Sequence, residues 1–232
     1  MNICCVERRS FMGKSPLQIV TAVDAASNAL RQDIFASYFT PGIKISESLL
    51  AERYGVSRHT IREAIAHLLS SGILTKSPNR GTFVKKISLD DVREIFQLRK
   101  LLEVEAVHRI GDMGQIPPDI FTALHNIENV DTAADWPQYV TMDARFHQSL
   151  VDAVNSKRLS RMYDIIVAEV QLCIVQSQEL LRGFAADAFD HRVIVSNLEA
   201  GETAEAAAFL EKHLDSAVER FEKAFARRKI AK

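Results

Sequence analysis

The sequence has few cysteines and no long apolar run. Cys4 and Cys5 are adjacent and Cys173 is remote, which matches neither a disulfide framework nor a zinc ribbon and favours a reducing compartment. The start, MNICCVERRSF, is too polar for a signal peptide. The most apolar stretch, residues 165–175, contains Glu169 and is too short for a membrane span. We therefore expect a soluble, cytoplasmic protein that makes no membrane contact.

Glycine and proline are also scarce, with 9 and 6 residues, and aromatic residues make up only 7% of the chain. Because glycine and proline interrupt helices most strongly, their scarcity favours a mainly α-helical fold. The formal net charge of -1 by itself indicates no particular partner. At 232 residues, the chain is long enough for one large domain or two small ones, each with its own core.

The first third of the sequence predicts three helices followed by a β-hairpin. Ser15, with Pro16 at the first helical position, is the predicted start of the first helix, which should end near Tyr38. Serine caps and glycine ends indicate two further helices, so that the three cover residues 16–38, 47–54 and 58–71. The apolar spacing then changes in ILTKS, the turn PNRG and TFVKKI, which is typical of two paired strands. This order of elements is that of a winged helix-turn-helix.

The rest of the chain predicts an all-α antiparallel bundle of about six helices. Ser88 and Asp91 have the spacing of a helix start. Helices are expected near residues 89–110, 118–128, 136–154, 157–182, 186–200 and 203–228. The predicted organisation is a flexible tail over residues 1–15, a winged helix-turn-helix domain over 16–87 and a helical domain over 88–232.

The third predicted helix carries a polar face that a protein core does not explain. Its apolar residues recur at i, i+4, i+7 and i+8 and form a stripe of Ile61, Ile65, Leu68 and Leu69. Arg58, His59 and Arg62 point elsewhere, at the N-terminal end of the helix. A recognition helix reaches bases in the major groove with its N-terminal residues, and arginine can bond a guanine edge or hold a phosphate.

Charge is divided unevenly along the chain. Between Lys44 and Lys86 there are eight lysines and arginines against three glutamates, a net charge of +5, so the remainder carries -6. A basic module of this kind fits a phosphate backbone. Two arginines on one helix are by themselves more often simply solvated. The helix–glycine–helix spacing, the turn PNRG and the uneven charge together favour nucleic-acid binding instead.

The segment SESLLAERYGVSRHTIREAIAHLLSSGILTKSPNRGTFV closely resembles the DNA-binding domain of the GntR family of bacterial transcription regulators. That family has the run L-A-E-x-x-G-V-S-R-x-x-V-R-E-A-L and a hairpin ending in R-G-x-x-V. The resemblance implies a homodimer on a pseudo-palindromic double-stranded DNA operator. The DNA contacts that we expect are Ser48, Ser57, Arg58, His59, Thr60, Arg62, Asn79, Arg80 and Gly81. Because the family often has Thr-Pro in place of His59-Thr60 and glycine in place of Asn79, no operator sequence can be transferred.

The helical part contains an aspartate and three histidines whose spacing suits a metal. Asp143 and His147 are four residues apart and therefore lie on one helix face. His191 and His213 each lie near the apolar stripe of a later helix. Together these groups suit a divalent transition metal, with zinc as the default and nickel or manganese as alternatives. From spacing alone, the alternative that each is an ordinary hydrogen-bonded core residue stays open.

From LRKLLE at residues 98–103 to the last helix, the chain resembles the FCD ligand-binding domain of the same family. In metal-containing members, an aspartate and three histidines hold an ion that orients a small carboxylate metabolite. The ligands that the resemblance implies are Asp143, His147, His191 and His213. Arg99 occupies a position often near that pocket and can pair with a carboxylate, although a salt bridge to Glu103 accounts for it equally well. The resemblance covers roughly residues 29–225.

These patterns predict a regulator that is not an enzyme and whose affinity for operator DNA changes when a small organic acid binds at the metal. One alternative is a metalloenzyme fused to a DNA-binding module, because three histidines and a carboxylate can activate water. No further residue, however, has the spacing of a general base. Another alternative is a regulator in which the metal is purely structural.

Overall fold

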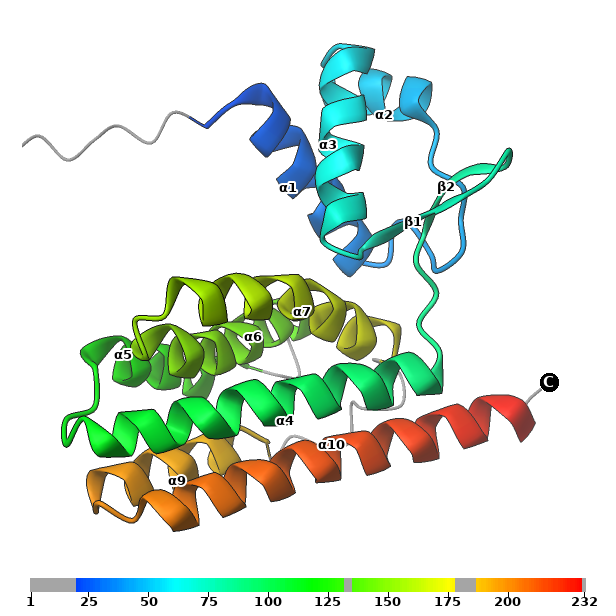
Figure 1. Ribbon diagram of the computed structural model, residues 1–232. Helices are drawn as coiled ribbons and strands as arrows, with labels where there is room; N and C mark the ends of the chain where they lie inside the picture. Colours follow the sequence, from blue (N-terminus) through cyan, green and yellow to red (C-terminus); the bar gives the residue numbers. More distant parts are fainter. Residues whose placement is uncertain (1–19, 132–134, 178–186, 231–232) are drawn as a thin grey trace, which may run out of the picture.

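The computed structural model describes residues 20–131, 135–177 and 187–230 of the chain (Figure 1). The first elements are α1 (Ala22–Phe35), α2 (Glu47–Tyr54), α3 (Arg58–Ser70), β1 (Leu74–Ser77) and β2 (Gly81–Val84). The helical part that follows contains α4 (Leu89–Asp112), α5 (Pro118–Glu128), α6 (Trp136–Ala153), α7 (Lys157–Gln176), α9 (Asp187–Glu199) and α10 (Thr203–Ile230). The predicted mainly α fold, with a winged helix-turn-helix and about six bundle helices in the described residues, is confirmed.

Short-range hydrogen bonds set the helix-turn-helix. The Ser46 hydroxyl accepts a bond from the Leu49 amide at the start of α2, and the Ser57 hydroxyl accepts one from the Thr60 amide, at 3.1 Å, at the start of α3. Between the two helices, Gly55 ends α2 with a φ of 65°, a left-handed conformation that glycine adopts at little cost. These caps turn the chain so that α2 and α3 pack on each other.

The first helix differs from the prediction. It begins at Ala22, because Thr21 and Asp24 form a capping box in which each side chain accepts a bond from the other residue's amide. Residues 20 and 21 are not helical, so one continuous helix from Pro16 to Tyr38 is wrong. Ser15, Pro16 and the predicted flexible tail lie outside the described residues. The helix also ends earlier, at Phe35, and Ser37 has a left-handed φ of 62°.

The two long helices α4 and α10 run antiparallel through the bundle (Figure 1). Ion pairs join Arg93 to Glu222 and Lys100 to Asp215, so later residues of α4 meet earlier residues of α10. On its other side, α4 contacts α6 and α7. The helix α4 continues to Asp112, two residues beyond its predicted end near residue 110, and therefore contains Gly111. A Cβ at Gly111 would collide with Thr203, so this glycine permits close packing.

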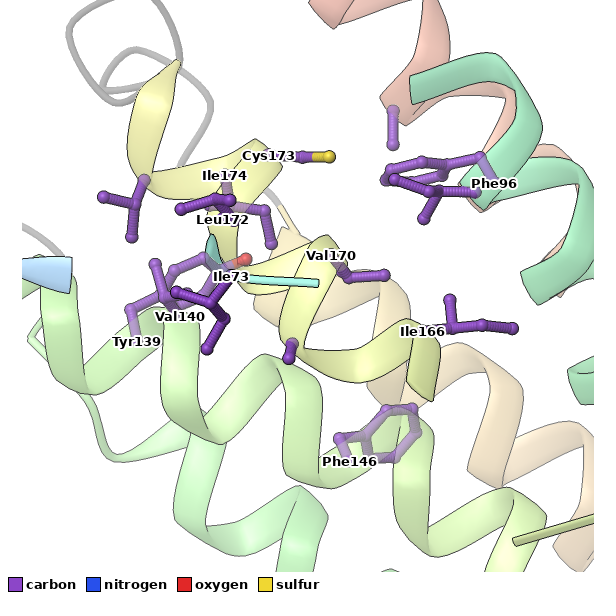
Figure 2. Close-up of a cluster of buried hydrophobic side chains, with 14 of the residues drawn as sticks. Ile73, Phe96, Tyr139, Val140, Phe146, Ile166, Val170, Leu172, Cys173 and Ile174 are labelled. Atoms are coloured by element: carbon purple, nitrogen blue, oxygen red, sulfur yellow. The ribbon is translucent and has the colours of Figure 1, made fainter. Parts of the chain in front are cut away.

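The winged part consists of α1–α3 and the β1–β2 hairpin, which is the wing, and the bundle consists of α4–α7, α9 and α10. The two parts share one hydrophobic core. Ile73, just before β1, belongs to the same buried cluster as Val140 of α6 and Leu172 of α7 (Figure 2). Close by, a Cβ on Gly72 would collide with the carboxylate of Glu169 in α7. A shift of α7 would therefore displace the residues that lead into β1. Among the helices of the described ranges, none has the length and apolarity needed to cross a membrane.

The helix α7 ends at Gln176, whereas the sequence predicted an end near residue 182. The predicted stretch 178–182 lies outside the described residues, as does residue 186 at the predicted start of the next helix. The helix predicted over residues 118–128 is observed with these bounds, and prolines stand at its start.

Candidate metal centre and nucleic-acid interface

Three helices bring the four predicted ligands into the bundle interior. Asp143 and His147 come from α6, His191 from α9 and His213 from α10. All four side chains are buried, and His147 and His191 are fully so. The helix α6 exposes one face to the core because its apolar residues follow helical spacing, and Asp143 and His147 lie one turn apart on that face.

The three histidines converge on one point. One ring nitrogen from each lies within 4.8 Å of those of the other two, and the Nε2 atoms of His147 and His191 are 3.2 Å apart. Asp143 Oδ1 lies 3.5 Å from His191 Nε2 and 3.9 Å from His147 Nε2. Imidazole nitrogens and a carboxylate at such distances are the donors that zinc and other divalent transition metals use.

Two carboxylates orient the imidazoles. Glu103 Oε2 lies 2.7 Å from His147 Nδ1, and Asp190 Oδ2 lies 3.2 Å from His213 Nδ1. In each case the carboxylate favours a proton on Nδ1 and leaves the Nε2 lone pair for the centre, as in carboxylate–histidine–metal arrangements. Neither role was predicted from the sequence. Asp190 directly precedes His191 in the sequence, and Glu103 was considered only as a partner for Arg99.

The local environment keeps these donors in the forms that a cation requires. Burial lowers the pKa of His147 to about 4, although Glu103 opposes this shift. Burial likewise lowers the pKa of His213. Burial opposes ionisation of Asp143, but its hydrogen bond with His191 holds the pKa of this carboxyl well below its usual range. Near pH 7 the neutral imidazoles of His147 and His213 and the carboxylate of Asp143 therefore supply lone pairs and one negative charge, which fits a divalent cation.

A buried ion pair supports this centre. Arg99 Nε donates to Glu103 Oε1 at 2.7 Å, and the Tyr163 hydroxyl donates to the same oxygen. Burial opposes the charge of Glu103, but Arg99 lowers the pKa of this carboxyl to about 2. The salt bridge that the sequence left as an alternative is therefore present. It does not use the whole guanidinium, because Arg99 Nη2 is buried without a hydrogen-bond partner in the described residues.

A cavity lies beside the candidate centre. Its wall includes two of the predicted ligands, Asp143 and His213, together with Arg99. The remaining lining residues are Phe96, Trp136, Tyr139, Ile174, Ala217, Arg220 and Phe221. The structure thus places the predicted effector residue Arg99 and two of the four predicted metal ligands on the wall of one cavity.

The predicted DNA contacts lie on the surface of the winged part. Arg58 and His59 are exposed at the N-terminal end of α3, and Ser48 is exposed in the first turn of α2. Ser57 caps α3 and bonds Thr60, so these two residues also shape the helix end. Because helix N-termini attract anions, this end of α3 favours a phosphate as well as a base edge.

Arg62 and the wing complete this surface. Arg62 is 60% exposed and bonds Glu47 at 3.1 Å, a surface pair that an approaching phosphate can replace. Asn79 lies in the turn between the strands with a left-handed φ of 58°, which explains how asparagine can stand where the family commonly has glycine. Arg80 follows it and is exposed, and Gly81 begins β2. The N-terminal end of α3 and the turn between β1 and β2 therefore each expose arginine side chains.

Two family models match the chain. The model described as bacterial regulatory proteins of the gntR family matches residues 22–84, and the FCD domain model matches residues 94–216, more than half of the chain. This chain belongs to the GntR family and contains an FCD domain. It is thus a transcriptional regulator of the GntR/FCD type, and the two matches cover the winged part and the bundle in turn.

Individual relatives of this GntR protein are also described as regulators. It is 29% identical to an uncharacterised HTH-type transcriptional regulator, YdhC, of Bacillus subtilis, over 63% of this chain and 66% of YdhC, just under two thirds of its length. It is 31% identical to the HTH-type transcriptional repressor RspR of Escherichia coli, over 52% of this chain and 54% of RspR.

Solved structures show the same architecture. A GntR protein from Rhodococcus sp. RHA1 matches 87% of this chain and 98% of its own, with a TM-score of 0.78 and 26% identity. McbR/YncC of Escherichia coli matches 89% of this chain and all of its own, with a TM-score of 0.70. At 18% identity, the second likeness supports the fold alone.

Proposed function

We propose that this GntR protein is a homodimeric regulator whose affinity for operator DNA depends on a metal and a small carboxylate. In each subunit, α3 and the wing bind one half of a pseudo-palindromic site. A divalent transition metal, zinc first and nickel or manganese as alternatives, would be held by Asp143, His147, His191 and His213. The observation that carries the proposal is the convergence of three buried histidines in a chain with a basic helix-turn-helix.

The chemistry of the effector follows from the cavity. A metal bound there would provide a positive anchor for a carboxylate, next to the guanidinium of Arg99. The roles of this chain's residues are distinct: the histidines supply lone pairs, Glu103 and Asp190 orient two of them, and Arg99 offers an unused donor to the cavity. An organic acid is thus the class of effector that this site supports.

A physical connection exists between the cavity and the DNA-binding part. Ile174 lines the cavity, and two residues later Gln176 bonds the segment that leads into α4. Its side-chain amide donates to the Lys85 carbonyl at 2.7 Å and accepts from the Ile87 amide at 3.1 Å. Lys85 itself forms a 2.6 Å ion pair with Glu169 of α7. A shift of α7 on effector binding would therefore move the connection between the two parts.

The expected size of the effect follows from linkage. Couplings between two ligands of one protein are typically about 1–3 kcal/mol, which changes operator affinity about five- to 150-fold. The same factor applies in reverse, so operator DNA would change the affinity for the effector equally.

A purely structural metal remains the rival function, and one observation favours it. The three histidines come from three different helices and are buried, so an ion between them would cross-link the bundle. The two proposals differ at the cavity, because a regulatory metal requires its neighbouring space to bind a carboxylate. Under the structural alternative, chelation lowers the melting temperature without altering how carboxylates affect DNA binding.

Metal content and DNA affinity together test the proposal. We expect about one metal ion per purified chain by elemental analysis, and nearly none in the His147→Ala, His213→Ala double variant. A His108→Ala variant, which removes an exposed imidazole of α4, should keep the ion. Fluorescence anisotropy on an operator fragment selected from a random-sequence library should show the five- to 150-fold effector response only with the ion bound. Unchanged metal in the double variant would contradict the ligand assignment.

A further inference from the structure

The residues that line the cavity beside the candidate metal centre indicate the shape of its ligand as well as the charge of its acidic group. We propose that its occupant is an aromatic carboxylate with a second oxygen acceptor, of the hydroxybenzoate class. This inference rests on the proposed function, since it takes the occupant of that cavity to be the effector. Three features of the wall support it: a buried cationic donor, a buried neutral donor and two pairs of aromatic rings.

The cationic donor is Arg99. Its side chain is 3% exposed, and its Nε is occupied by Glu103. Its Nη2 is buried, lies on a residue that lines the cavity and has no partner in the described ranges. Arg220 adds a second guanidinium to the same wall. A buried N–H without an acceptor is costly, so an anionic oxygen at this end of the cavity is favoured.

The neutral donor is Trp136, at the start of α6. Its indole Nε1 is also buried without a partner within the described part of the chain, and the residue lines the same cavity. A buried indole N–H usually finds an acceptor. Arg99 comes from α4 and Trp136 from α6, so the two residues contribute to the cavity wall from different helices. Each of the two donors needs an acceptor oxygen, and a carboxylate together with a second oxygen supplies both.

Aromatic rings form much of the remaining wall. Phe96 and Phe221 pack edge to face with centroids 5.5 Å apart, and Trp136 and Tyr139 pack with centroids 5.3 Å apart. The chain is only 7% aromatic, yet four of the residues that line this cavity are aromatic. Aromatic surfaces of this kind favour a flat ring through stacked or edge-to-face contacts. A small aliphatic acid satisfies Arg99 but leaves these rings and the indole N–H without a ligand.

The chain contains one tryptophan, so its fluorescence reports on this cavity directly. The full-length protein as purified is titrated with the three hydroxybenzoates, benzoate, cyclohexanecarboxylate, acetate and the neutral benzamide, and calorimetry checks each affinity. We expect the best hydroxybenzoate to bind most tightly and benzoate about tenfold more weakly. Acetate, cyclohexanecarboxylate and benzamide should each be at least tenfold weaker than benzoate.

Two variants separate recognition from stability. Trp136→Phe keeps a ring but removes the N–H, so by calorimetry the best hydroxybenzoate should fall to the affinity of benzoate while benzoate itself is unchanged. A purely structural role of Trp136 would weaken both ligands alike and would overturn this assignment. Arg99→Lys keeps a charge beside Glu103 but loses the planar donor pair, and it should weaken every carboxylate without affecting benzamide.

The remaining outcomes distinguish a failure of this inference from a failure of the proposed function. If acetate binds as tightly as any benzoate, the aromatic class is wrong while the carboxylate-responsive regulator stands. If benzamide binds as tightly as benzoate, the anionic requirement at Arg99 is wrong. If no carboxylate binds the metal-loaded protein, the effector half of the proposed function fails together with this inference.

Discussion

The two parts of the molecule present their candidate residues in opposite ways. In the winged part, Arg58, Arg62 and Arg80 are exposed, and all lie within one continuous stretch of sequence. In the bundle, Arg99 and His147 are buried and belong to a network drawn from several helices. Exposed charges contribute little to folding and are free to bind a partner, whereas buried charges affect stability and function together. Substitutions should therefore change binding without changing stability in the winged part, whereas in the bundle they should change both.

The largest expected effect tests the buried side of this comparison. Glu103→Ala leaves the Arg99 charge buried without its partner, which should lower the free energy of unfolding by about 3–5 kcal/mol. The matched control is Glu105→Ala in the same helix, which breaks the Arg109 ion pair of the same 2.7 Å length but with both side chains 50% exposed. That change should lower the free energy of unfolding by roughly 0.5 kcal/mol or less. Equal losses in urea unfolding of the two variants would remove the contrast between buried and exposed pairs.

The second effect tests the exposed side. Arg58→Ala and Arg62→Ala should each weaken operator binding by about 1–3 kcal/mol and, where the arginine holds a phosphate, reduce the salt dependence of binding. Neither should change the free energy of unfolding by more than roughly 0.5 kcal/mol, because both side chains are exposed. Anisotropy titrations at several salt concentrations provide the measurement, with exposed Arg161→Ala in α7 as the control. If both substitutions leave operator affinity unchanged, α3 is not the DNA-recognition helix.

The smallest expected effect concerns the connection between the parts. Gln176→Ala removes two hydrogen bonds to the backbone of residues 85–87, each contributing about 1 kcal/mol to stability. We expect operator affinity without effector to change little, and the effector-induced change in affinity to shrink. Gln148→Ala, which removes a glutamine bonded only to Asp152 among the contacts described for its side chain, is the control. An identical effector response in the two variants would show that this connection does not carry the coupling.

Most of the fold could be predicted because its signals are local. The starts of α2, α3 and α4 follow from serine caps whose hydroxyls bond amides three residues on, and such bonds depend on no distant part of the chain. The start of α1 was wrong because two cap patterns compete within a few residues and Thr21 with Asp24 forms the complete box. The end of α4 lies two residues beyond its predicted position, because Gly111 permits the close approach of Thr203, far along the chain, and does not end the helix.

The sequence by itself determined the family, the order of the elements, the uneven charge and the spacing that suggests metal ligands. Only the tertiary structure decided which side chains support those ligands: Glu103 and Tyr163 around Arg99, Asp190 behind His213, and the indole of Trp136 on the cavity wall. The physical reason is distance along the chain. Caps and helix faces follow from interactions within a few residues, whereas contacts such as that of Glu103 with His147, 44 residues apart, exist only once the helices have packed.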